Sequence, residues 1–486
     1  MKCRFTPFWF AGHCKAADRQ GRNSAFLKRL VLLLGAVWTL PAAAEKFWIP
    51  AIEEPWRQIA GNPDLGEYTD EKQQPVDFAL WQAADGTWQL WSCIRFTKLG
   101  GHTRLFYRWE GKHLTDSNWA PMGIAMMAEP ELGEPLGGLQ APHVVRYKGK
   151  YWMIYGDWDN IRMAVSRNGK DFKRCDKGRV LFTEGPQVNS RDPMLLFTRG
   201  KWHCYYTAFP DERGYVYCRT SDNLLQWSAP VIVSFGGTAG SGPYSCECPH
   251  VVEILPGRYF LFRTQYYGPG AQTTVYESQN PLLFGIDNDA GFRARLNICA
   301  PEIVFHQGRY YIAALNPNLD GIRIARLHWK SFGKPVFDFD NPQHRRLWML
   351  LDGNLDSVFT DSRRHGLYPK TRYYISTAEK AGSAPDDART ADIESPPFTL
   401  ESPECIVWLS GGQDPQRLYL VFLDAQNGQE YLRLTPKGQD LPEPILADCR
   451  LFAGKSVKIR IADHSSDSLG RITFGGIYER TPQQDR

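Results

Sequence analysis

Three acidic residues stand in contexts that recur along the chain, and together they could carry out acid–base chemistry. Asp77 opens the segment "DFALWQ", Asp192 opens "DPMLLF", and Glu247 directly precedes "CPHVVEI". One carboxylate can act as base or nucleophile, a carboxylic acid can donate a proton, and a third can tune charge or hold a substrate. Crowded like charges raise the pKa of at least one of them, which keeps an acid protonated near neutral pH. Such a trio suits glycosidic bond cleavage, provided that the fold brings the three together.

A repeat of about fifty residues supplies the elements that would position these acids. Each unit is a strand, a tight glycine turn and an aromatic strand, followed by a third strand and a polar turn. The units begin with "DFALWQAADGTWQLWS" (77–92), "APHVVRYKGKYWMIYG" (141–156), "DPMLLFTRGKWHCYYT" (192–207), "CPHVVEILPGRYFLFRT" (248–264) and "APEIVFHQGRYYIAAL" (300–315). Five units of about four strands each predict a five-bladed β-propeller, whereas unrelated hairpins of a sandwich would not keep this phase.

The start of each unit is the position most favourable for a shared site. A propeller brings the first strand of every blade to a central channel, so the residues that open these strands should converge. The five aligned positions are occupied by Asp77, Ala141, Asp192, Cys248 and Ala300. Glu247 lies one residue before the fourth of them. We therefore expect blades one, three and four to place their carboxylates in one pocket.

The chain divides into four segments by composition. Residues 1–44 have the pattern of a signal peptide, with Lys28-Arg29 before an apolar run and an Ala-rich cleavage site, which predicts export to the periplasm or the extracellular space. An N-terminal extension covers 45–75, and the propeller catalytic domain covers 76–343. The last segment, 344–486, alternates apolar and polar residues around an Asn-Gly turn, which predicts a C-terminal β-sandwich. The fold class is thus all-β.

The charge of the exported chain limits its partners. Removing the seven basic and one acidic residues of 1–44 leaves 50 basic and 52 acidic residues, a formal charge near −2. This balance argues against nucleic-acid binding. The later chain has no apolar run long enough to span a bilayer. We expect a monomer whose partner is a carbohydrate.

The cysteines are too sparse for a disulfide framework, because nine remain after residue 44. Cys204 with Cys218, and Cys405 with Cys449, are the pairs that could meet. Cys248 follows Cys246 by two positions, a spacing that suits neither a redox motif nor, without further ligands, a zinc site. Cys248 is therefore interpreted as a small residue packed at the channel wall. No metal site or cofactor is expected, and a structural calcium ion is left open.

Seven further residues are candidates for binding the sugar. They lie near the ends of the inner hairpins or beside the aligned positions, where aromatic faces and hydrogen-bonding groups could hold a saccharide. They are Trp91, Arg95, His143, Trp158, Arg191, Arg263 and Gln265. For each of them, structural packing is the alternative.

The motifs at the acids resemble known glycosidase signatures. "NSRDP" (189–193) and "ECP" (247–249) are similar to the Arg-Asp-Pro and Glu-Cys motifs of glycoside hydrolase families 32 and 68, the invertase, levanase and levansucrase group. The phasing of the acids is also similar to family 43. These resemblances imply a five-bladed propeller, with Glu247 as general acid/base, Asp192 stabilising the transition state or tuning the acid, and Asp77 as nucleophile or base. They imply that Arg191 binds sugar hydroxyls.

The resemblance extends to the C-terminal segment and has one departure. "SPPFTL", "WLSGGQDPQRLYLVFLDAQNG" and "GKSVKIRIADHSSDSLGRITF" resemble the β-sandwich of many family 32 fructanases. Around its nucleophile the invertase group carries Asn-Asp-Pro-Asn-Gly, whereas this chain has "PVDFALW". The sequence thus predicts an exported glycoside hydrolase acting on an oligo- or polysaccharide, with a furanoside such as a fructan or an arabinan as the candidate. The alternatives are a non-catalytic carbohydrate-binding propeller and a structural surface protein.

Overall fold

The computed structural model describes residues 46–361, 372–379 and 384–481, and the segment expected to be a signal peptide lies outside them. The described chain is built from strands β1 to β31, with six 3-10 turns and one α-helix, α1 (Pro342–Arg345). The prediction of an all-β protein is confirmed. Within these residues no helix combines the length and apolar character needed to cross a membrane.

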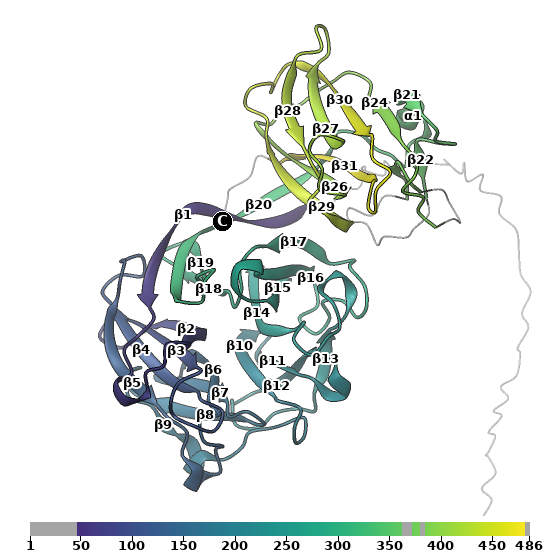
Figure 1. Ribbon diagram of the computed structural model, residues 1–486. Coiled ribbons are helices and arrows are strands. Elements are labelled where there is room, and N and C mark those ends of the chain that lie inside the picture. Colours follow the sequence, from purple (N-terminus) through teal and green to yellow (C-terminus); the bar gives the residue numbers. More distant parts are fainter. Residues whose placement is uncertain (1–45, 362–371, 380–383, 482–486) are drawn as a thin grey trace, which may run out of the picture. The chain divides into compact units, whose positions relative to one another are not determined.

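Four antiparallel sheets of four strands each follow one another along the chain (Figure 1). The first contains β2 (Gln74–Gln82), β3 (Trp88–Arg95), β4 (Leu105–Gly111) and β5 (Ala120–Met126). The second contains β6 (Gln140–Tyr147), β7 (Lys150–Gly156), β8 (Ile161–Ser166) and β9 (Lys173–Arg174). The third contains β10 (Arg191–Thr198), β11 (Lys201–Ala208), β12 (Tyr215–Ser221) and β13 (Val231–Ser234). The fourth contains β14 (Glu247–Leu255), β15 (Arg258–Tyr266), β16 (Gln272–Ser278) and β17 (Phe292–Leu296).

A fifth sheet is completed by the beginning of the described chain. β18 (Glu302–His306), β19 (Arg309–Leu315) and β20 (Gly321–Pro335) form a meander, and β1 (Phe47–Gly61) pairs antiparallel with β20. Part of the segment placed ahead of the propeller by sequence therefore supplies the fourth strand of the last sheet. Because the first and last strands of the ring pair in one sheet, backbone hydrogen bonds close the ring.

The first strands of the five sheets are neighbours in order. β2 packs beside β6, β6 beside β10, β10 beside β14, β14 beside β18, and β18 again beside β2. This closed order of inner strands is the arrangement of a β-propeller (Figure 1). The tight turns after the first strands contain Gly149, Gly200, Gly257 and Gly308, whose φ angles lie between 73° and 76°. Glycine adopts this conformation without a Cβ clash, so the repeated glycine specifies the hairpin.

The residue that opens each inner strand has an unusual backbone. Asp77, Ala141, Asp192, Cys248 and Ala300 all have positive φ, between 37° and 56°. The pairing register shifts at the first four of these positions, as in a β-bulge. All five residues line one small cavity. The alignment made from sequence thus identifies five structurally equivalent positions at the centre, and a bulge marks the first four of them.

The C-terminal region, residues 336–481, consists of two sheets that share one apolar core. One sheet contains β22 (Phe359–Thr360), β23 (Tyr374–Ser376), β26 (Glu404–Gly411), β29 (Gln439–Asp448) and β31 (Ile472–Arg480). The other contains β21 (Met349–Gly353), β24 (Ala391–Glu394), β25 (Phe398–Thr399), β27 (Leu418–Asp424), β28 (Glu430–Leu434) and β30 (Ser456–Asp463). Buried side chains of both sheets, such as Val407 and Phe474 from one and Leu420 and Ile461 from the other, form this core.

The two cysteine pairs considered from sequence have different outcomes. The Sγ atoms of Cys405 and Cys449 lie 3.3 Å apart in the C-terminal core, so these residues do meet. Cys204 and Cys218 belong to separate apolar clusters, and Tyr205 is the residue opposite Cys218. Neighbouring positions of a strand point to opposite faces, so the register keeps this second pair apart.

Candidate active site

A cavity of about 680 Å³ lies where the inner strands converge. Two of the expected acids, Asp77 and Glu247, line it, together with Arg95, Arg191 and Trp158 among the other candidates. Asp192 lines the small cavity at the strand starts, which Asp77 also lines. The structure therefore brings together the three carboxylates that the sequence singled out, from the first, third and fourth sheets.

Asp77 is held by two neutral donors. The hydroxyl of Tyr267 donates to its Oδ1 over 2.9 Å, and the thiol of Cys248 donates to the same oxygen over 3.1 Å. The Cys248 Sγ and the Tyr267 hydroxyl are themselves 3.0 Å apart. Burial raises the pKa of both the Tyr267 hydroxyl and the Cys248 thiol well above their usual values, so both keep their protons. These two donors fix the orientation of the carboxylate.

Asp192 is almost completely buried beside Asp77. Its Oδ2 accepts the backbone N–H of Cys248 over 3.0 Å, while its Oδ1 has no hydrogen-bond partner. Burial, reinforced by the negative charge of Asp77, raises the pKa of Asp192 to about 7. The Arg191 guanidinium, 3.7 Å away, opposes this shift. Asp192 can therefore hold or release a proton near neutral pH.

Glu247 shares an ion pair with Arg191 at the start of β14. A terminal guanidinium nitrogen of Arg191 donates to Glu247 Oε1 over 3.0 Å. Burial raises the pKa of Glu247, Arg191 opposes that rise, and the charge of Asp77 adds to it. The net direction is upward, as required of a carboxylic acid that gives a proton to a leaving group. Arg191 also lies over the rings of Phe209 and Tyr244, which fix its plane.

Arg263 and Gln265 position the loop that leads to Glu247. The buried guanidinium of Arg263 donates to the carbonyl oxygens of Ser245, Gly236 and Gly240 and to the hydroxyl of Ser234. The amide of Gln265 donates to the Ser245 carbonyl as well, over 3.3 Å. Neither residue lines the cavity of about 680 Å³. Sequence reasoning assigned both to sugar binding, and the structure corrects this, because their donors are used to hold backbone.

Two other candidates also lie away from this cavity. Trp91 is buried in the apolar core between Trp81 and Phe172. His143 is buried beside Glu302, whose carboxylate is 3.8 Å from its Nδ1, and burial lowers the pKa of His143 to about 4. Both side chains are buried within their strands, Trp91 as the fourth residue of β3 and His143 as the fourth of β6.

Several cavity residues were missed by sequence reasoning. Gln140 occupies the place in the second sheet that Arg191 and Glu247 occupy in the third and fourth, directly before the aligned position, and this phase could have identified it. Tyr267 directly follows β15, at a position that the sequence repeat does not include. The remaining missed residues of the cavity wall are His102, Arg104, Asp159, Gln187, Asn189, Phe209 and Tyr244.

The innermost polar cluster behaves as a hydrogen-bonded unit. One potential ligand atom from each of Asp77, Asp192 and Cys248 lies within 4.8 Å of the others. A metal ion would require the thiolate of Cys248. Burial raises the pKa of that thiol, and its proton is donated to Asp77. Asp77, Asp192 and Cys248 are therefore better suited to sharing protons in hydrogen bonds than to binding a metal cation.

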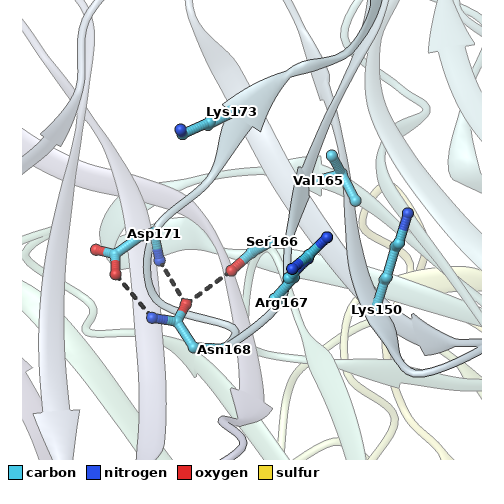
Figure 2. A pocket seen from close by; sticks show the side chains of 7 residues that line it. All are labelled: Lys150, Val165, Ser166, Arg167, Asn168, Asp171 and Lys173. Carbon is cyan, nitrogen blue, oxygen red and sulfur yellow. Dashed lines mark hydrogen bonds between the residues drawn. The ribbon is translucent and has the colours of Figure 1, made fainter.

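A second hollow, of about 500 Å³, lies on the second sheet, and Figure 2 shows its wall. In this wall the side chain of Asn168 accepts from the hydroxyl of Ser166 and donates to Asp171. Its basic residues, Lys150 and Lys173 among them, are exposed. These polar groups satisfy one another in a turn, and none of the three acids lines this hollow. We therefore take the cavity at the strand starts as the active-site candidate.

The chain is similar to known glycosidases. Residues 108–281 match the model of the glycosyl hydrolases family 32 N-terminal domain, a range that includes Asp192 and Glu247. A "Probable sucrose-6-phosphate hydrolase" of Vibrio cholerae is 24% identical over 222 residues, which cover 42% of this chain and 37% of that protein. The chain therefore matches little more than a third of the length of this curated relative.

Two solved structures can be aligned with the chain. A family 32 beta-fructofuranosidase of Bombyx mori is 12% identical, with a TM-score of 0.40, over 88% of this chain and 95% of that chain. An endo-arabinase of Bacteroides thetaiotaomicron is 14% identical, with a TM-score of 0.42, over 52% of this chain and 94% of that chain. The resemblance to β-propeller glycoside hydrolases inferred from the motifs is confirmed, and residues 108–281 carry the sequence signature of the family 32 N-terminal domain.

Proposed function

We propose that this protein is an exported glycoside hydrolase whose five-bladed propeller, followed by a β-sandwich, cleaves a furanoside of an oligo- or polysaccharide. The observation that carries the proposal is the meeting of Asp77, Asp192 and Glu247, from three sheets, at two adjoining cavities that share Asp77. The family match over 108–281 supports the same activity. A fructan or an arabinan is the candidate substrate, in line with the names of the similar proteins.

In the proposed reaction the three acids have separate tasks. Glu247, with its pKa raised by burial, donates a proton to the oxygen of the leaving sugar. Asp77, oriented by Tyr267, acts on the anomeric carbon as nucleophile, or as the base that activates water. Asp192 balances the charge that develops between them. Carboxyl groups and water suffice for this chemistry, so the proposal needs no cofactor.

Arg191 links the acid to the substrate. Its ion pair with Glu247 holds the carboxyl group in place, and its position on the cavity wall lets it donate to sugar hydroxyls. When Glu247 gives up its proton, the adjacent guanidinium stabilises the carboxylate that is left. The same residue can thus favour both proton transfer and binding.

The test is Glu247→Gln, which keeps size and hydrogen bonding but removes the transferable proton. We expect the wild type to release sugar from at least one member of a panel of fructans and arabinans, and the variant to lose about 10²–10⁴-fold in kcat while still binding that glycan. NMR of the first product distinguishes retention from inversion. Binding of a glycan by the wild type without release of sugar would instead favour a non-catalytic carbohydrate-binding propeller.

A further inference from the structure

One cation of the active-site cavity has no carboxylate partner. Arg104, directly before β4, lines the same cavity as Asp77 and Glu247. Within the described chain no carboxylate oxygen lies within 4.0 Å of its guanidinium, and its buried Nε has no hydrogen-bond partner. Removing a guanidinium from water without an opposing charge costs free energy. The position therefore favours an anionic partner, which the described residues do not supply.

The other two arginines of the cavity are already engaged. Arg191 donates to Glu247 and lies near Asp192. Arg95 directs two nitrogens at the side-chain oxygen of Gln74, at 3.0 and 2.8 Å. Among the described residues the side-chain N–H groups of Arg104 have no hydrogen-bond partner, in contrast to those of the other two arginines of this wall. By contrast, Arg162, which is buried outside the cavity wall, has the carboxylate of Asp157 as its partner.

An aromatic surface accompanies the uncommitted cation. The Arg104 guanidinium lies 4.8 Å from the ring centre of Trp158, and the His102 ring stacks on the same indole at 3.8 Å. Burial, together with the charge of Arg104, lowers the pKa of His102. His102 is therefore neutral at pH 7 and adds a ring, not a second charge. An aromatic face beside hydrogen-bond donors is suited to a sugar ring.

The turn that presents Trp158 is rigid. Trp158 has a φ of 93°, which a bulky residue adopts only when its surroundings enforce it. The preceding residue, Asp157, is fully buried, accepts the backbone N–H of Asn160 over 2.7 Å and pairs with Arg162. The next residue, Asp159, lines the cavity but accepts the backbone N–H of Gln187 and forms no ion pair with Arg104. The indole and the cation are thus held in one arrangement.

We propose that Arg104, stacked on Trp158, binds an anionic substituent, a phosphate or a carboxylate, on the saccharide that enters the cavity. A guanidinium offers parallel N–H donors that match two oxygens of either group. The anion would pair with the partly buried guanidinium, while Trp158 and His102 hold the sugar that carries it. This inference rests on the proposed function only in placing a saccharide in the cavity.

The test compares three probes that differ at one carbon. They are sucrose, sucrose 6-phosphate and the derivative of sucrose with a carboxylate in place of the same hydroxymethyl group. Binding is measured by calorimetry in the Glu247→Gln background, so that turnover does not interfere. We expect at least one charged probe to bind tenfold or more tightly than sucrose, and the phosphate and carboxylate arms identify which anion is preferred.

Substitutions of Arg104 then test whether this side chain causes the preference for a charged probe. Arg104→Gln should reduce the affinity ratio of the charged probe to sucrose at least tenfold. Arg104→Lys should retain part of this ratio, because the charge remains but the planar fork is lost. Arg323 is the matched control, since it stacks on Trp56 at 4.3 Å and its buried Nε is equally unpartnered, yet it does not line the cavity. Arg323→Gln should leave the preference unchanged. Thermal unfolding of each variant checks its fold, and the lysine variant decides the question if the glutamine variant unfolds.

The outcomes separate this inference from the proposed function. Equal binding of all three probes, no binding of the charged probes, or a preference that persists in Arg104→Gln would overturn the anion site. Hydrolysis of a glycan without any preference for anions would overturn this inference alone. A charge preference that depends on Arg104, without hydrolysis of any glycan by the wild type, would overturn the proposed activity and leave the anion site standing.

Discussion

The propeller region, residues 47–335, and the C-terminal region, residues 336–481, are both antiparallel β structures, but they bury charge differently. In the propeller, carboxylates from three sheets meet beside one cavity, and burial raises the pKa values of Asp192 and Glu247. In the C-terminal region one aspartate, Asp463, is buried at the end of β30, where its pKa is raised to about 6. A shifted pKa is therefore common to both regions, and convergence of several charged groups on a cavity distinguishes the first.

Geometry explains this difference. A ring of sheets directs the start of every inner strand to one centre, so five residues distant in sequence become neighbours. Two facing sheets instead direct alternate side chains into a shared apolar layer, such as Val457, Ile459 and Ile461 of β30. In the described part of this region buried carboxylates have local partners, as Glu394 has in Lys458 and Arg460. The comparison suggests four experiments.

The largest effect is expected for Asp77→Asn, which removes the nucleophile or base. We expect kcat/KM to fall by about 10³-fold, equivalent to about 4 kcal/mol of transition-state stabilisation. Kinetics on the glycan identified by the panel measure it. Asp463→Asn is the control from the other region and should keep wild-type kinetics. A similar loss in both variants would contradict the separation of roles between the two regions.

The second experiment compares two arginines. Arg263→Met leaves buried carbonyl groups of the loop before Glu247 without donors, so it should lower the free energy of unfolding by about 3 kcal/mol and also reduce activity. Arg460→Met removes a partly exposed ion pair with Glu394 and should cost at most about 1 kcal/mol. Denaturant unfolding monitored by tryptophan fluorescence measures both. Equal costs would show that the loop has other supports.

The third experiment measures how the buried carboxyl group of Asp463 affects stability at different pH values. Its folded-state pKa of about 6 exceeds the ordinary value of 3.8, so the native state binds the proton more tightly than the unfolded state does. The contribution of Asp463 to the free energy of unfolding should therefore be greatest below about pH 4. It should decline as the pH rises to about 6 and stay low above that pH. Asp463→Asn should stabilise the protein by about 3 kcal/mol at pH 7 and by much less at pH 4. Unfolding curves at both pH values test this, and a pH-independent effect would contradict it.

The smallest effect is a shift of the pH–rate profile. Arg191 holds the pKa of Glu247 below the value that burial alone would give. Arg191→Gln should therefore raise the pKa of the proton donor, so the alkaline limb, where Glu247 loses its proton, should move to higher pH in kcat profiles. A limb that moves to lower pH would assign the proton donor to another group.

Much of the propeller could be predicted from sequence, because the repeat is carried by residues with strong local preferences. The glycines at 149, 200, 257 and 308 specify hairpins, and the aligned positions from Asp77 to Ala300 mark the strand starts. The fourth strand of the last sheet was not predicted, since β1 pairs with β20 over more than 250 residues of chain and carries no repeat motif. Such long-range pairing depends on closure of the ring.

The site was predicted in part for the same reason. Asp192 and Glu247 follow from repeat phase and Arg191 from the family resemblance, whereas Trp91 and Arg263 were assigned to the cavity and lie elsewhere. A strand end has two sides, and sequence alone does not show which side faces the cavity and which holds a loop.

By itself, the sequence determined the all-β class, the repeating hairpins and the identity of the carboxylates, because these depend on local propensity and on a regular period. Only the tertiary structure decided that Tyr267 and Cys248 orient Asp77, that Arg263 supports the loop before Glu247, and that Arg104 faces the cavity without a partner. These properties arise from side chains of different sheets meeting in a buried space, where solvation and distance set the charge of each group.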